Sequence, residues 1–120
     1  PGHVKKILLC SGKVYYDLAV AREQRAITDV AIVRLEQLFP YNHELTDALA
    51  PYADGTRLVW VQEEPLNYGG WYYIHATLPA AMGGRFPLSV VGRAPSASPA
   101  TGSKASHTFE QKKLIDEAFA

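Results

Sequence analysis

The chain has no excess of charge and no long apolar run. Its 12 lysine and arginine residues balance 12 aspartate and glutamate residues, so the formal net charge is zero. Binding of nucleic acid or of an anionic membrane surface through excess positive charge is therefore not expected. No run approaches the ~20 apolar residues that span a bilayer. These absences predict a soluble protein with neither nucleic acid nor membrane as a partner.

Cysteine is also scarce, because Cys10 is the only one in the chain. A single cysteine excludes an internal disulfide, and its place in the apolar stretch "ILLC" predicts a buried thiol in a reducing compartment. The chain lacks an initiator methionine and a signal sequence, beginning "PGHVKK" and ending "DEAFA". We therefore expect residues 1–120 to form a single domain, as a fragment of a longer protein.

Four β-like runs alternate with four helical patterns. The predicted strands are short and rich in β-branched residues: Val4–Cys10, Val30–Glu36, 57–62 and 87–92. The predicted helices bury stripes at helical spacing: Val14, Leu18 and Ala21; Leu45, Ala48, Leu49 and Tyr52; Trp71, Ile74, His75 and Leu78; Ile115, Ala118 and Phe119. Strands that alternate with helices pair in parallel through right-handed crossovers. The fold class is therefore α/β, a three-layer α/β/α sandwich with a mainly parallel sheet.

Capping patterns predict where three of the helices begin. Ser11 and Asn42 are expected to be N-caps, after Pro40 has ended the strand that precedes the second helix. Thr108 and Gln111 match a capping box for the last helix, with His107 hydrogen-bonded at its start.

Open parallel sheets bind ligands outside the carboxyl ends of their strands. The segments "SGK", "EQLFPY", "QEEPLNYGG" and "GRAPSASPATGS" all fall at that edge. "CSGKV" is not a P-loop, since the upstream glycine is missing and Val14 stands at the magnesium-binding position. An anion site at the start of the following helix stays open, with Ser11, Gly12, Lys13 and Lys104 as its candidate residues.

The sequence predicts no catalytic residue and no metal site. His75 lies on an apolar helical stripe, where we expect it to be packed, and the four histidines have no metal-ligand spacing. The serines of the loop between Arg93 and Ser106 lack the G-x-S-x-G elbow of a nucleophile.

Glu63 and Glu64 end a predicted buried strand, so at least one should face inward and need donors. The candidate donors are backbone N–H groups around Gly69 and Gly70, the arginines 34 and 93, and another subunit. A structural carboxylate is favoured over a general acid or base, because no second titratable group stands nearby in sequence.

Four stretches together resemble one family: "CSGKVYYDL", "AIVRLEQLFPY", "VWVQEEPLNYGGW" and "VGRAPSASPATGSKASHTFEQKKLIDEAF". The chain is similar over nearly its whole length to the C-terminal domain of the thiamine-diphosphate-dependent, decarboxylating component of 2-oxoglutarate dehydrogenase, a transketolase C-terminal-like domain. The resemblance implies strand order 2-1-3-4, with a further edge strand from residues upstream.

The resemblance also implies the function. The parent enzyme of the tricarboxylic acid cycle oxidatively decarboxylates 2-oxoglutarate and passes a succinyl group to the lipoyl arm of the succinyltransferase component. It would be a homodimer, cytoplasmic in a bacterium and in the mitochondrial matrix of a eukaryote. Thiamine diphosphate and magnesium would lie between the preceding domains, with none bound by this fragment, which is expected to fold but to be inactive. Its interdomain or dimer contacts would be Glu63, Glu64, Asn67, Trp71 and Arg93.

Three alternatives stay open at this point. The chain could be a regulatory module that binds acyl-CoA or a nucleotide, through the helix start at Gly12 or the loop between Arg93 and Lys104. It could be the equivalent domain of a 2-oxoadipate dehydrogenase or a transketolase relative. It could also be a free-standing flavodoxin-like binding protein.

Overall fold

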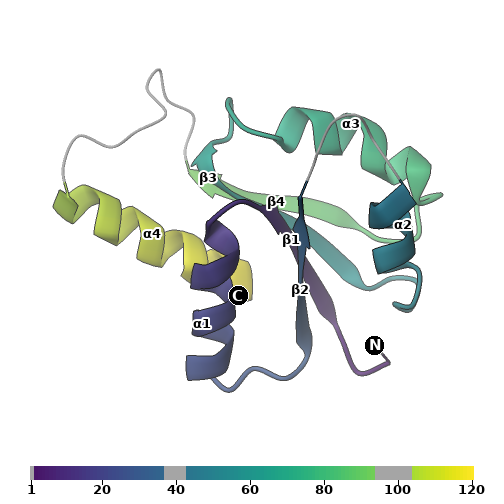
Figure 1. Cartoon of the computed structure of the whole chain (residues 1–120), viewed down its shortest axis with the longest axis horizontal. Coiled ribbons are helices and arrows are strands. Elements are labelled where there is room, and N and C mark those ends of the chain that lie inside the picture. The colour runs from purple at the N-terminus through teal and green to yellow at the C-terminus, as the bar shows by residue number, and fades with distance from the viewer. Residues whose placement is uncertain (1, 37–42, 94–103) are drawn as a thin grey trace.

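A four-stranded parallel sheet forms the centre of the computed structural model. The structure describes the backbone of residues 2–36, 43–93 and 104–120, and the side chains of these ranges except 43, 44 and 104–107. The strands are β1 (Lys6–Ser11), β2 (Val30–Leu35), β3 (Arg57–Pro65) and β4 (Leu88–Arg93). All pairs are parallel and the order is β2-β1-β3-β4 (Figure 1). The predicted sheet and its order are confirmed.

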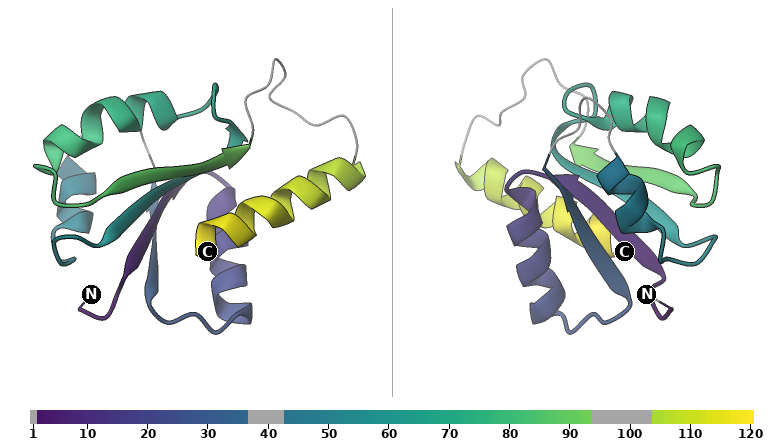
Figure 2. Two further views of the ribbon diagram at one scale, coloured as in Figure 1. Left: turned by 180° about the vertical axis from the view of Figure 1, so that it is seen from behind. Right: turned by 45° about the vertical axis from the view of Figure 1, so that its right-hand side comes forward.

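Two helices cover each face of the sheet. Helices α1 (Val14–Gln24) and α4 (Lys104–Phe119) lie on one face, and α2 (His43–Leu49) and α3 (Trp71–Ala81) lie on the other (Figures 1 and 2). The three-layer α/β/α sandwich is thus confirmed.

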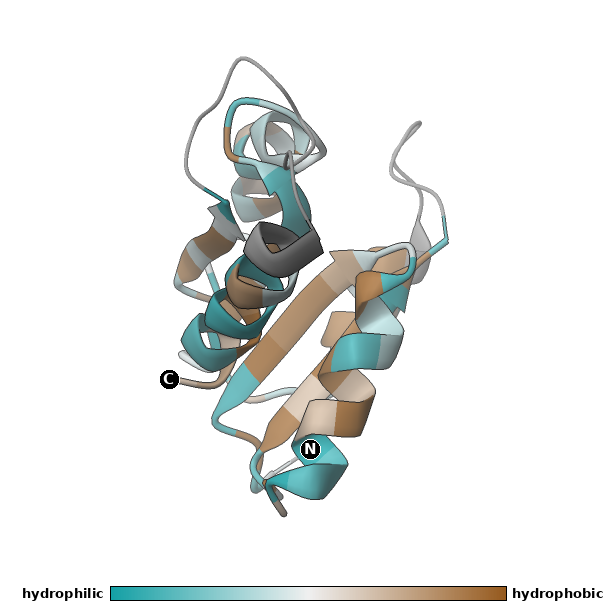
Figure 3. Cartoon of the chain, turned by 90° about the vertical axis from the view of Figure 1, so that its left-hand side faces the viewer, coloured by the Kyte–Doolittle hydropathy of each residue, from teal (hydrophilic) through white to brown (hydrophobic). Residues whose placement is uncertain are grey.

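The side chains of β1 alternate between two apolar clusters. Ile7 and Leu9 pack with α2 and α3, whereas Leu8 and Cys10 pack with α1 and α4. All four are fully buried, and β3 alternates in the same way, which makes the two central strands apolar on both faces (Figure 3). Strands that are buried on both faces read as continuous apolar runs, and "ILLC" is one of them.

The thiol of Cys10 is buried as predicted. Burial raises its pKa to about 11, although the nearby Arg34 cation acts in the opposite direction. We expect the native chain to react with Ellman's reagent at pH 8 roughly 100-fold more slowly than the urea-unfolded chain, since only the thiolate attacks. Equal rates in the two states would contradict this assignment.

The predicted N-cap of the first helix is wrong. Ser11 is the last residue of β1, and α1 begins at Val14 with Lys13 at its N-cap and no side-chain cap. Gly12 adopts the left-handed conformation (φ 76°) and turns the chain directly from strand into helix, which leaves Ser11 no capping position. The predicted cap Asn42 lies outside the described residues.

The last helix also begins earlier than predicted. It starts at Lys104, so Thr108 and Gln111 lie inside it rather than forming its capping box. The amide of Gln111 is held by side chains from other elements, as described below, and these contacts replace the local pattern. The helix buries Leu114, Ile115 and Ala118, and Phe119 is partly buried beside them. His107 lies one turn into the helix, but its side chain is outside the described residues.

A buried lysine ties the first strand to the end of the last helix. The ammonium of Lys6 donates to the carbonyl oxygens of Ala118 and Ala120, at 3.1 and 2.5 Å. Burial is the main reason why the pKa of Lys6 is lowered, so the ammonium needs these acceptors. In the described part of the chain, no helix has the length and apolar character that crossing a membrane requires.

Candidate functional site

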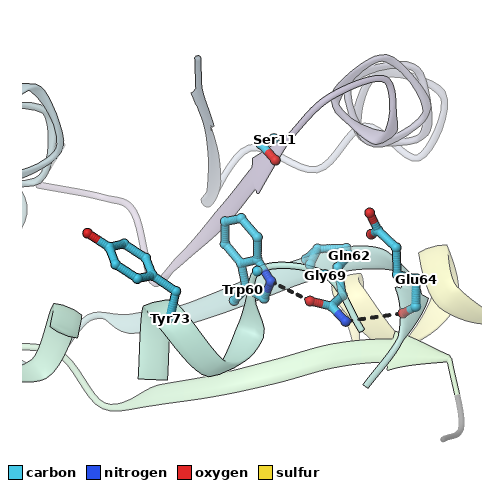
Figure 4. A pocket seen from close by; sticks show the side chains of 8 residues that line it. Ser11, Trp60, Gln62, Glu64, Gly69 and Tyr73 are labelled. Carbon is cyan, nitrogen blue, oxygen red and sulfur yellow. Dashed lines mark hydrogen bonds between the residues drawn. The ribbon is translucent and has the colours of Figure 1, made fainter. Parts of the chain in front are cut away.

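A pocket opens at the carboxyl edge of the sheet, where the parallel strands end. Helix α1 leaves β1 toward one face and α3 leaves the neighbouring β3 toward the other, so a crevice forms between the two strand ends. The Glu64 pocket, as we name it, has a volume of about 360 Å³ (Figure 4). Its lining residues are Ser11, Trp60, Val61, Gln62, Glu64, Gly69, Gly70 and Tyr73.

Gln62 organises the floor of this pocket and is only 3% exposed. Its carbonyl oxygen accepts from Trp60 Nε1 at 2.9 Å and from the Trp71 backbone nitrogen at 3.1 Å. Its Nε2 donates to the carbonyls of Glu64, Pro65 and Tyr68, at 3.2, 2.9 and 2.8 Å. These partners fix the orientation of the amide, because an indole N–H can only donate and a carbonyl can only accept. Gln62 therefore holds the whole corner between β3 and α3.

The same glutamine explains one glycine of the corner. Gly69 has φ 76°, and a Cβ there would lie 3.0 Å from Gln62 Oε1. A side chain at Gly69 would meet both backbone strain and the buried amide. Sequence reasoning missed Gln62, although a polar residue directly after the apolar run "LVWV" was a signal for it.

The third strand is longer than predicted. It extends beyond the predicted run 57–62, through Glu63 and Glu64 to Pro65, with a register shift between Val61 and Pro65. Proline is tolerated there because it lies at the end of the strand, beyond the irregularity. The two carboxylates consequently lie on the strand itself, on opposite sides of it.

Glu63 is the inward-facing carboxylate, with 18% of its side chain exposed. Its Oε2 accepts from Gln111 Nε2 at 3.0 Å and lies 3.5 Å from the ammonium of Lys13. The donors predicted within the chain, which are the N–H groups around Gly69 and Gly70 and the arginines 34 and 93, are not among these partners, so that part of the prediction is wrong for Glu63. The donors come from the turn before α1 and from α4, within the same domain. Glu63 is thus a structural carboxylate that joins three elements.

Gln111 lies at the centre of this polar cluster, although the capping pattern predicted only a local role for it at the start of the last helix. Its Nε2 also donates to Asp17 Oδ2 at 2.8 Å, and its Oε1 accepts from Arg93 Nη2 at 2.9 Å. Arg93 lies 3.6 Å from the carboxylate of Glu110 in addition. The cluster connects the ends of β3 and β4 with α1 and α4, and its two cations face three carboxylates.

The other predicted contact residues lie around the pocket without joining that cluster. Glu64 and Asn67 are exposed, and Glu64 lines the pocket. Trp71 is partly buried against the core of its own domain, with its ring 5.1 Å from the ring of His75. His75 itself is exposed, so its predicted packed position is wrong. The buried stripe of α3 is narrow, with Ile74 and Leu78 at its centre.

The four residues of the candidate anion site are not brought together. Lys13 is engaged by Glu63, and Ser11 faces the pocket. Helix α4 starts at Lys104, and its first turn lies well away from the turn before α1 (Figures 1 and 2). Gly12 and Lys13 therefore have no support from Lys104 in binding an anion.

The described residues do not fit thiamine diphosphate and its magnesium ion as a site of their own. Among the residues that the structure covers, no group of three or more His, Cys, Asp or Glu side chains could hold a metal ion.

Exposed aromatic side chains surround the carboxyl edge. Tyr16 is in the first turns of α1, Tyr68 in the corner after β3 and Tyr72 in the first turn of α3, and they are 57%, 38% and 65% exposed. Tyrosine is enriched in protein interfaces, because it combines a large apolar ring with a hydroxyl. This edge therefore has the composition of a contact surface.

The parallel order and the crevice between β1 and β3 define a doubly wound α/β domain with a crevice at its carboxyl edge. Residues 1–119 match the family described as 2-oxoglutarate dehydrogenase C-terminal, and the chain belongs to this family.

Relatives support this membership across bacteria and eukaryotes. The chain is 47% identical over its full length to the 2-oxoglutarate dehydrogenase E1 component of Haemophilus influenzae, and 44% identical over 98% of its length to that of Cupriavidus necator. It is 41% identical over 99% of its length to the mitochondrial 2-oxoglutarate dehydrogenase-like protein of Rattus norvegicus. It spans only 12–13% of these relatives.

Proposed function

We propose that the chain is the C-terminal domain of a longer enzyme that oxidatively decarboxylates 2-oxoglutarate and passes the succinyl group to a lipoyl-bearing succinyltransferase. The observation that carries this proposal is the family match over residues 1–119, together with relatives named as 2-oxoglutarate dehydrogenase E1 components. The enzyme would work in the cytoplasm of a bacterium or in the mitochondrial matrix of a eukaryote, since both kinds of relative exist.

The role of this domain in that enzyme would be assembly. Its carboxyl edge would pack against the domains that bind thiamine diphosphate and magnesium, and against the other subunit of a homodimer. Three exposed tyrosines at this edge and the exposed residues Glu64 and Asn67 support such a role. The rigid corner built on Gln62 supports it too, because a preordered surface loses little entropy on binding.

The test removes residues 1–120 from the full-length enzyme and supplies them as a separate polypeptide. We expect the separate polypeptide to have no thiamine-diphosphate-dependent activity toward 2-oxoglutarate. The truncated enzyme should lose most of its activity and dimer affinity, and adding the polypeptide should restore part of both. Activity can be measured as CO₂ release, and dimerisation by analytical ultracentrifugation.

Two results would contradict the proposal. Turnover of 2-oxoglutarate by the 120 residues alone would place catalytic groups in this domain. A truncated enzyme that keeps its dimer affinity and full activity would remove the domain from assembly. A variant of the added polypeptide with Gln24→Leu, an exposed residue of α1 on another surface, serves as the control that should restore activity like the unaltered polypeptide.

A further inference from the structure

The carboxylate of Glu64 has no hydrogen-bond or ion-pair partner among the described residues, although it stands at the mouth of a formed pocket. In Figure 4 its side chain rises from β3 on the same side as the ring of Trp60, toward the space below Ser11. Only its backbone carbonyl is engaged, by Gln62. Both oxygens of the carboxylate can therefore accept hydrogen bonds from a cationic group.

The cations nearest in the fold are committed elsewhere. Lys13 is paired with Glu63, Arg93 with Glu110 and Gln111, and Arg34 with Glu36 and the ring of Tyr16. The sequence of the two undescribed internal stretches, 37–42 and 94–103, contains neither lysine nor arginine. Glu64 is exposed and thus hydrated in the isolated chain, and a cation that pairs with it would come from outside the described residues.

The walls of the pocket suit the rest of such a side chain. The partly exposed ring of Tyr73 closes one side, and Trp60 and Val61 lie beneath the floor of the pocket with 2% and 0% of their surface exposed. Lysine and arginine bury their methylene stems along apolar surfaces while the charged group finds its partner. The volume of about 360 Å³ leaves room for one long side chain and its backbone.

An anion is a poorer occupant of the same pocket. The N-terminus of α3 would attract one, but the N–H of Trp71 already donates to Gln62 Oε1 at 3.1 Å. The Glu64 carboxylate adds a negative charge at the mouth, and no described cation offsets it. The pocket thus selects a positive group.

We propose that the Glu64 pocket receives an arginine or lysine side chain from another domain of the same enzyme, which packs its stem on Tyr73 and pairs its charge with Glu64. This inference rests on the proposed function, because it needs the remaining domains, which make up most of the length of the relatives.

The experiment is chemical footprinting of the full-length enzyme. The wild type and the Glu64→Gln variant are labelled at arginine with phenylglyoxal and at lysine with an acetylating ester, and reaction rates are read by mass spectrometry. We expect one arginine or lysine outside residues 1–120 to react several-fold faster in the variant. Glutamine keeps the size of the exposed side chain, so the fold is retained, and urea unfolding of the variant checks this.

Glu117→Gln is the matched control, since Glu117 is an exposed carboxylate on the outer surface of α4. It should leave every labelling rate unchanged. The inference is overturned if no basic residue outside residues 1–120 changes in Glu64→Gln, or if the residue that changes belongs to a second copy of this domain. The proposed function is tested separately by removing the domain. If the enzyme needs the domain but no basic residue outside residues 1–120 reacts faster in Glu64→Gln, only the assignment of the pocket is refuted.

Discussion

Replacing Gln62 with leucine should lower the free energy of unfolding of the chain by about 3 kcal/mol. The substitution strands two buried donors, Trp60 Nε1 and the backbone nitrogen of Trp71, which both end on Gln62 Oε1. Each buried group without a partner costs about 1–3 kcal/mol. The lost carbonyl contacts add less, because the oxygen of Pro65 keeps its bond from the Tyr68 nitrogen at 2.8 Å. Urea unfolding followed by tryptophan fluorescence measures the change.

Gln24→Leu provides the matched control for this prediction, because Gln24 is exposed on α1. Its effect should stay within about 0.5 kcal/mol, as is usual for surface substitutions. A loss of stability no larger in Gln62→Leu than in Gln24→Leu would mean that the corner between β3 and α3 does not depend on the buried amide.

The second large effect is expected at Gly92, where a larger side chain would destroy a close packing contact. A Cβ at this position of β4 would lie 2.7 Å from Leu66 Cδ2 and 3.2 Å from Gln62 Cγ. Leu66 would have to rotate out of its place, and Gln62 cannot follow because its amide is held by hydrogen bonds at both ends. Gly92→Val should therefore cost about 3 kcal/mol, at the upper end of the usual range for overpacking. Thermal unfolding of the two chains compares them directly.

Ser89→Val is the control that shows whether the loss of stability in Gly92→Val comes from placing valine in β4 or from the close packing at Gly92. Ser89 lies on the same strand but is exposed, and valine favours strands, so this variant should be neutral or slightly stabilising. If Gly92→Val were as stable as Ser89→Val, the space between β4 and the corner would be larger than the structure shows. Because Leu66 follows the strand that carries Glu64, Gly92→Val should also weaken dimerisation of the full-length enzyme.

The strands and helices that form the layers of this fold could be predicted because each is marked by a pattern within a few consecutive residues. "ILLC" and "LVWV" are apolar on both faces, and the stripes at Val14 and Ile74 have the period of a helix. The order β2-β1-β3-β4 followed from a resemblance rather than from periodicity, since pairing partners lie up to about 50 residues apart. The predicted helix starts at Ser11 and Thr108 are wrong. At Ser11 a glycine turn takes the place of a side-chain cap, and the partner residue Gln111 of the second cap is engaged in tertiary contacts.

The polar contacts of the site could not be predicted for a related reason. Glu63 and Gln111 are 48 residues apart, and Gln111 and Asp17 are 94 apart, so no sequence window contains both partners. A sequence pattern indicates which side chains need a hydrogen-bond partner, but the identity of that partner depends on the tertiary fold. Glu63 has its donors inside the domain, whereas the adjacent Glu64 on the other side of the strand is exposed.

The two faces of the sheet differ in how far apart along the chain their helices lie. Helices α2 and α3 flank β3 in sequence, whereas α1 and α4 lie far apart along the chain and meet through contacts such as Gln111 with Asp17, which spans 94 residues. Closing a long loop costs chain entropy before its contacts form. Helix α4 should consequently be the last element to pack during folding and the first to detach. Its amide hydrogens should exchange with deuterium before those of β1 and β3.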